Sequence, residues 1–85
     1  MASYSVFIKP SAAKELETVP LRDRRRLVTR INRLASHPRP AGCEKLTGAE
    51  RYRIRQGAWR VLYTIDDEVV TVVVVKVGHR REVYR

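Results

Sequence analysis

The sequence has almost no cysteine and no long apolar segment, and these absences exclude several classes of protein. It contains one cysteine, Cys43, which excludes an internal disulfide and stands in no metal-ligand spacing. No segment approaches the roughly 20 apolar residues of a membrane span, and residues 1–5 lack the apolar stretch of a signal peptide. These absences predict a cytoplasmic protein without a metal, another cofactor or a membrane partner. With 85 residues, we expect a single domain, 1–85, with one small core.

Acidic residues are also scarce. The chain has 9 Asp and Glu against 18 Lys and Arg, a formal net charge of +9, and 14 of the 18 basic residues are arginine. Arginine carries a planar fork that grips phosphate or carboxylate with two hydrogen bonds, whereas lysine acts as a point charge. This bias favours a polyanionic partner, nucleic acid first and an acidic protein second. The alternative is a generally basic, solvated surface.

The N-terminal half of the sequence indicates one strand followed by two helices. Residues 4–8 are β-prone. Ser11 is a suitable N-cap for a helix that starts near Ala12. Apolar side chains that recur every three or four positions predict a second helix over residues 20–36. We expect the two helices to pack as a hairpin.

The C-terminal half has the period-two alternation of strands. Residues 51–56 alternate, Gly57 and Ala58 suit a two-residue turn in which glycine takes a positive φ, and residues 59–65 form the return strand. Residues 69–77 are almost continuously apolar, which predicts an interior strand covered on both faces. The order β-α-α-β-β-β predicts an α+β domain, in which the N-terminal helical hairpin covers one face of a mostly antiparallel sheet.

The hairpin register predicts which side chains share a face. With Gly57 and Ala58 in the loop, Arg55 pairs with Arg60, and directly paired residues lie on the same face. One face then carries the apolar set Tyr52, Ile54, Val61 and Tyr63. The other carries Arg51, Arg53, Arg55, Arg60, Leu62 and Thr64. Like charges opposite each other cost on the order of a few tenths to one kcal/mol. Such local costs are expected at functional sites.

A second interpretation is that these arginines only keep an exposed sheet soluble. Solubility is usually achieved with mixed charges, and no acidic residue lies between Arg51 and Thr64. The segment after the interior strand favours the functional interpretation, because a tail leaving that strand can reach the same face. It supplies a titratable ring, two guanidinium groups and a phenol, from His79, Arg80, Arg81 and Tyr84.

Several motifs occur in order along the chain. They are Lys45-Leu46-Thr47-Gly48, Tyr52-Arg53-Ile54-Arg55, Gly57-x-Trp59-Arg60-Val61-Leu62-Tyr63 and Val77-Gly78-His79-Arg80-Arg81-Glu82-Val83-Tyr84. Together they resemble the RelE/ParE toxin superfamily, on its RelE branch. The similarity spans essentially the whole chain, and the ordered set is more specific than any one motif.

The resemblance implies an mRNA interferase, the toxin of a bacterial type II toxin–antitoxin pair. RelE-like toxins enter the ribosomal A site and cut mRNA without a metal. The ribose 2′-hydroxyl attacks the adjacent phosphate, which leaves a 2′,3′-cyclic phosphate and a 5′-hydroxyl. A cognate antitoxin wraps the toxin and blocks or distorts its site. The family's functional residues match Arg53, Arg55, Arg60, Arg80 and Tyr84.

The chemistry of the reaction suggests a role for each residue. Arg60 and Arg80 are expected to stabilise the negative charge of the phosphorane transition state. Tyr84 would stack on a base or orient the nucleophile, unless it is a packed C-terminal aromatic. Trp59 falls on the apolar side of the hairpin, which favours a place in the core. Phosphate contacts are expected from Lys45, Arg51, Arg53, Arg55 and Arg81.

Proton transfer is where this chain departs from the family. Well-studied RelE members carry lysines at the positions of Arg53 and Arg55, and arginine is a poor general base. His79 is the nearby side chain of a type that titrates near neutral pH, so we expect it to act as the general acid or base. The alternative is a histidine that only contacts phosphate.

Two other functions are compatible with the same sequence. ParE-like proteins share the fold and inhibit DNA gyrase, but they lack the nuclease residues. Arg60, the tail that begins at Gly78 and the final tyrosine favour the RelE branch. A basic module that only docks an acidic antitoxin or a nucleic acid is the third possibility. Such a module would bind in a strongly salt-dependent way and leave RNA intact.

Overall fold

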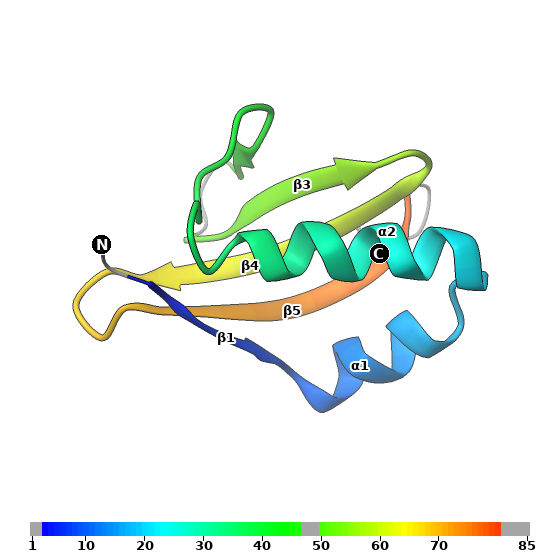
Figure 1. Cartoon of the computed structure of the whole chain (residues 1–85), viewed down its shortest axis with the longest axis horizontal. Coiled ribbons are helices and arrows are strands. Elements are labelled where there is room, and N and C mark those ends of the chain that lie inside the picture. The colour runs from blue at the N-terminus through cyan, green and yellow to red at the C-terminus, as the bar shows by residue number, and fades with distance from the viewer. Residues whose placement is uncertain (1–2, 47–49, 81–85) are drawn as a thin grey trace.

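The computed structural model describes residues 3–46 and 50–80. The elements are, in chain order, β1 (Ser5–Ile8), α1 (Pro10–Glu17), α2 (Leu21–Arg33), β2 (Glu44–Lys45), β3 (Tyr52–Gln56), β4 (Trp59–Asp66) and β5 (Thr71–His79). The strands form one sheet in the order β1-β5-β4-β3-β2 (Figure 1). β1 pairs with β5 in parallel, and the other neighbours pair antiparallel. The predicted α+β class is therefore confirmed, with β2 as a strand that the sequence pattern did not indicate.

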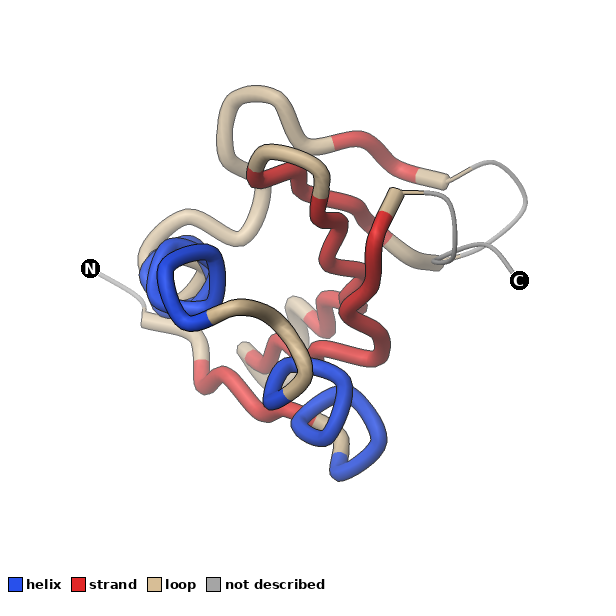
Figure 2. The backbone as a smooth tube through the Cα atoms, turned by 90° about the vertical axis from the view of Figure 1, so that its right-hand side faces the viewer, coloured by secondary structure: helices blue, strands red, loops and turns tan. Residues whose placement is uncertain are grey.

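Both helices lie on the same side of the sheet (Figure 2). They contribute Ala12, Leu16, Leu27 and Ile31 to a core whose strand residues are Ile54, Val61, Tyr63, Val72, Val74 and Val77. Helix α2 is strongly polar on its outer side, so it is attached to the sheet by its few buried apolar residues, Leu27 and Ile31. None of the described helices is long and apolar enough to cross a membrane.

The start of α1 differs from the prediction. The helix begins at Pro10 rather than near Ala12, and Lys9 is its N-cap, with no capping bond from a side chain. Ser11 is therefore inside the helix, and its predicted capping role is wrong. The reason is that proline has no N–H to leave unsatisfied and a φ that suits the first helical turn.

Strand β5 contains a bulge that changes which side chains face the core. Leu62 of β4 pairs with Lys76, but the next residue, Tyr63, pairs with Val74, so Val75 is the extra residue. The strand is interior, as predicted, since it lies between β1 and β4, but it is not covered on both faces. Val72, Val74 and Val77 are buried, whereas Val73 and Val75 are only half-buried because both helices lie on the other face.

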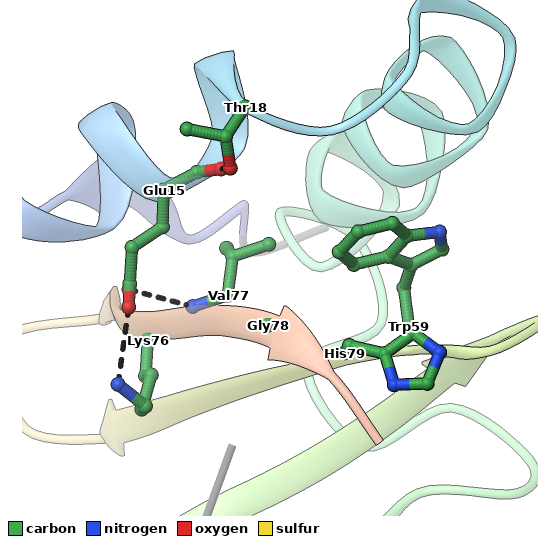
Figure 3. Close-up of a pocket in the computed structure, with 7 residues that line it drawn as sticks. All are labelled: Glu15, Thr18, Trp59, Lys76, Val77, Gly78 and His79. Carbon is green, nitrogen blue, oxygen red and sulfur yellow. Dashed lines mark hydrogen bonds and ion pairs between the residues drawn. The ribbon is translucent and has the colours of Figure 1, made fainter. Parts of the chain in front are cut away.

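A carboxylate from α1 covers the part of β5 that β1 does not reach. The pairing of β1 ends where Ile8 meets Val74, so the edge of β5 is open beyond that point. There the Val77 backbone N–H donates to Glu15 Oε1 at 3.1 Å, and Lys76 Nζ lies 3.0 Å from Glu15 Oε2 (Figure 3). Because unpaired strand edges invite pairing with other chains, this contact protects the edge.

Tyr63 is the largest fully buried side chain of the core. Its hydroxyl donates to the Pro38 carbonyl at 2.8 Å, and its ring stacks on Tyr52 with centroids 5.9 Å apart. Burial raises the pKa of the Tyr63 phenol well above its ordinary value of 10.0. The folded protein therefore holds this proton at a pH where the unfolded chain releases it.

We expect the substitution Tyr63→Phe to change stability in a pH-dependent way. Near pH 7 the variant should be less stable by about 1 kcal/mol, because the Pro38 carbonyl loses its donor. A raised folded-state pKa stabilises the protein fully below the unfolded pKa, and this contribution falls as the pH rises above about 10. The gap between wild type and variant should therefore narrow in urea titrations above that pH. A constant gap would contradict the burial argument.

Candidate nucleic-acid interface

The β3–β4 hairpin has the register that the sequence predicts. Gly57 has φ +61°, and Gln56 pairs with Trp59 across the two-residue turn. Arg55 then pairs with Arg60, Ile54 with Val61 and Tyr52 with Tyr63. The apolar partners face the helices, so the arginines point to the opposite side of the sheet. We call the side chains of Arg53, Arg55 and Arg60 the arginine face.

The arginine face surrounds a buried leucine. Leu62 is only 3% exposed although it lies on the side of the sheet that the helices do not cover. In the register it stands between Arg53 of β3 and Lys76 of β5. Long basic side chains can cover apolar surface with their stems while the charged groups stay in water. The stems of Arg53 and Lys76, which flank Leu62 in the register, are therefore placed to cover it.

An acidic residue on this face was missed by the sequence analysis. Glu44 of β2 pairs directly with Arg53 and lies on the arginine face. Its Oε2 forms an ion pair with Arg53 Nη2, and its Oε1 lies 3.4 Å from Arg55 Nη2. The sequence analysis considered only the hairpin, which has no acidic residue on this face, whereas Glu44 belongs to the neighbouring strand β2. Two residues are too few to show alternation, so no sequence signal marked β2.

Arg60 and Arg80 lie near the same end of the hairpin. Arg60 pairs with Gly78 of β5, which has no side chain, and its Nη1 donates weakly to the Gly57 and Trp59 carbonyls at 3.4 Å each. The Arg80 backbone N–H donates to the Ala58 carbonyl at 2.8 Å, which fixes the start of the C-terminal segment beside the turn. Arg80 is exposed, as is Arg51, which directly precedes β3.

His79 does not join the arginine face. It is the last residue of β5 rather than part of a tail, and it pairs with Trp59 of β4. Because Trp59 and Arg60 are successive residues of one strand, their side chains point to opposite faces, and His79 lies on the face of Trp59. The two rings meet edge to face with centroids 5.7 Å apart. Trp59 lies on the helix side, as predicted, where its Nε1 donates to Asp23 at 3.2 Å, but it is half-buried and packs against the core rather than within it. The pairing of β4 with β5 extends further than the sequence indicated, which corrects the expected position of His79.

Lys45 also lies away from the arginine face. It pairs with Tyr52, whose partner Tyr63 is in the core, so Lys45 belongs to the helix side of the sheet at its edge. Its ammonium lies 3.9 Å from Glu50. Arg81 and Tyr84 are outside the described residues, so their predicted roles stay predictions.

A shallow pocket lies on the helix side, between α1 and the end of β5 (Figure 3). Glu15, Thr18, Trp59 and His79 are among its lining residues. The Glu15 carboxylate already accepts from Lys76 and Val77 there, as described above. In the described part of the chain, no three His, Cys, Asp or Glu residues lie close enough together to hold a metal ion.

The sequence and the fold were compared with those of known proteins. A family model for the ParE toxin of the type II toxin–antitoxin system parDE matches residues 6–84. A stretch of 37 residues is 49% identical to Toxin RelG of Mycobacterium tuberculosis (strain ATCC 25618 / H37Rv), and it covers 44% of this chain and 42% of that toxin. The match therefore spans less than half the length of this curated relative.

Solved structures match over much more of the chain. One chain of the RelBE2 toxin–antitoxin complex of Mycobacterium tuberculosis has a TM-score of 0.82 and 32% identity, over 92% of this chain and 99% of that one. For the archaeal RelE–RelB complex of Pyrococcus horikoshii OT3, the TM-score is 0.84 and the sequence identity is 27%, over 94% of this chain and 98% of the matched chain. For the E. coli RelBE complex, the TM-score is 0.79 and the sequence identity is 28%, over 91% of this chain and 96% of the matched chain.

The fold and the basic face define a class, the small α+β domains of the RelE type. Within that class, the chain belongs to the RelE/ParE superfamily of toxins of type II toxin–antitoxin systems.

Proposed function

We propose that this protein is a cytoplasmic mRNA interferase that cuts mRNA in the ribosomal A site. The observation that carries the proposal is the projection of Arg53, Arg55 and Arg60 from one face of a single hairpin, with Arg80 anchored at its turn. Guanidinium groups hold phosphate oxygens with paired hydrogen bonds, so such a face suits a polynucleotide backbone.

The proposed reaction needs no metal. The 2′-hydroxyl attacks the adjacent phosphorus, the bond to the 5′-oxygen breaks, and a 2′,3′-cyclic phosphate and a 5′-hydroxyl remain. The phosphorane that forms carries more negative charge than the ground state, so fixed cations favour it. In this proposal Arg60 and Arg80 stabilise that charge, while Arg53, Arg55, Arg51 and Arg81 hold the flanking backbone.

Tyr84 is proposed to stack on a base or orient the nucleophile. We do not include Lys45 and His79 among the residues that contact RNA in this proposal, because both lie on the helix side of the sheet.

A cognate antitoxin is the proposed protein partner. Three of the structures compared above are complexes of a RelE-type toxin with a RelB-type antitoxin. The formal charge of +9 on this chain favours an acidic or amphipathic segment in such a partner.

Inhibition of DNA gyrase is the second candidate function. The observation that favours it is the family model, which describes ParE toxins. Against it stands the set of arginines on one face, because their spacing along one hairpin suits an RNA backbone.

A pair of assays with purified components separates the two functions. We expect the protein to cut mRNA on programmed ribosomes and to leave gyrase supercoiling unchanged. Inhibited supercoiling with intact mRNA would instead favour the ParE-like function. Salt-dependent RNA binding without cleavage would leave only a binding module.

A further inference from the structure

An aromatic side chain is exposed on the face of the sheet that the helices leave uncovered. Phe7 of β1 is 59% exposed, and among the described residues it is the only aromatic one of the large exposed apolar side chains. The preceding residue, Val6, packs against the core, so the Phe7 side chain points to the opposite side of the sheet. Phe7 therefore lies on the same side of the sheet as the arginine face.

The register connects Phe7 with the arginine face. Phe7 pairs with Val73 of β5, and Val73 pairs with Thr64 of β4. Arg60 is four positions before Thr64 on the same strand. With about 4.8 Å between strands and about 3.4 Å per residue along a strand, the backbones at Phe7 and Arg60 are roughly 17 Å apart. A few nucleotides of one RNA strand can span this separation.

We propose that Phe7 is a stacking platform for one base of the RNA strand whose phosphates the arginine face holds. The inference rests on the proposed function and adds a contact to it, on the edge strand β1 (Figure 1). The ligand is a base of single-stranded RNA, because only an unpaired base offers a free ring face.

The surroundings of Phe7 suit a flat ring. Val73 and Thr64, which continue its row across the sheet, are half-buried and have short side chains, so the exposed phenyl ring projects above them. Sheets bind single-stranded RNA in this way, with exposed aromatic rings stacked on bases and basic side chains on the backbone. An apolar helix of a protein partner would instead need a groove for its side chains.

The distribution of charge limits the path of the bound strand. Two residues before Phe7, Ser5 pairs with Thr71. Thr71 pairs with Asp66, the first residue of the acidic run 66–68. Carboxylates repel phosphates, and the arginine face lies in the other direction from Phe7. A strand held by the arginine face should therefore end near Phe7, which places its last bound base on the ring.

An exposed phenylalanine also has a cost on this strand. β1 is an edge strand of the described sheet, and exposed apolar side chains on edge strands favour pairing with other chains. Phe7 is largely exposed, so it contributes little to the core in return. A local cost of this kind, without a benefit to folding, is expected at functional residues.

The test measures single-turnover cleavage of mRNA on programmed ribosomes over a range of protein concentrations. Stacking of a base on an aromatic ring contributes about 5-fold to 100-fold in affinity, so Phe7→Leu should raise the half-saturating concentration by a factor in that range. The rate at saturation should be unchanged, since stacking on a remote base is the same before and during the reaction. Phe7→Tyr keeps an aromatic ring and should behave like wild type.

An mRNA with one abasic nucleotide identifies the stacked base. The abasic nucleotide is moved one position at a time through the segment around the cleaved bond. At the position over Phe7, wild type should lose as much affinity as Phe7→Leu does with intact mRNA, and the two changes together should cost no more than either alone. Additive losses at every position would mean that Phe7 contacts something other than a base, which would overturn the proposal.

Leu21→Ala is the control, because Leu21 is 55% exposed but belongs to α2, on the other side of the sheet. It should cleave like wild type at every concentration. Phe7→Leu should unfold at the wild-type temperature, so that weaker binding is not a loss of fold. If Phe7→Leu saturates like wild type, or Phe7→Tyr loses as much affinity as Phe7→Leu, Phe7 is not a stacking platform and the proposed function stands. If wild type itself cuts no mRNA, the proposed function fails and the role of Phe7 fails with it.

Discussion

Replacing Arg60 by alanine should abolish most mRNA cleavage while leaving the protein folded. Arg60 is half-buried and lies on the face of the sheet opposite the hydrophobic core, so its replacement leaves the packing of the core intact. Removal of one preorganised group that stabilises a developing negative charge costs about 100-fold to 1000-fold in rate. We therefore expect a loss of that size in single-turnover cleavage on ribosomes, with an unchanged thermal unfolding curve.

The control for this prediction is Arg26→Ala. Arg26 is an exposed residue of α2, on the opposite side of the sheet, and its removal lowers the net charge by the same amount. It should cleave at nearly the wild-type rate. Equal losses in both variants would mean that overall charge, rather than the arginine face, drives the activity.

The largest effect on stability is expected from Leu27→Ala. Leu27 is fully buried and is one of the few residues that attach α2 to the sheet. Truncation of a buried leucine costs about 2 to 5 kcal/mol, through lost burial and the cavity that remains. Small domains are stable by only about 5 to 15 kcal/mol, so a substantial part of the total should be lost. Urea unfolding at neutral pH measures the change.

Val28→Ala makes a smaller truncation on the same helix and serves as the comparison. Val28 is 37% exposed, so its effect should be well below that of Leu27→Ala. The variant at Leu27 should keep its cleavage rate per folded molecule, since α2 does not contribute to the arginine face. Similar losses of stability in both variants would contradict the assignment of Leu27 to the core.

The hairpin was predictable from sequence because a two-residue turn leaves little choice of register. Once Gly57 and Ala58 form the turn, every pair back to Tyr52 and Tyr63 follows. The alternation of arginines with apolar residues then decides which side faces the helices. This is why the arginine face was predicted residue by residue.

The rest of the site depended on contacts between distant segments. Glu44 reaches the arginine face only because β2 adds to the free edge of β3, and two residues carry no periodic signal. The valine run of β5 shows no alternation, so neither the bulge at Val75 nor the pairing of His79 with Trp59 could be inferred. The sequence therefore predicted the cations of the hairpin, but it missed Glu44 and placed His79 on the wrong face of the sheet.

The most direct test of RNA cleavage by 2′-hydroxyl attack uses an mRNA with one 2′-deoxynucleotide. It is placed immediately 5′ of the bond that the wild-type protein cuts on the ribosome. We expect no cleavage at that bond, whereas the unmodified mRNA should give a 2′,3′-cyclic phosphate and a 5′-hydroxyl. Cleavage of the modified bond, or a 5′-phosphate on the product, would contradict the proposed reaction.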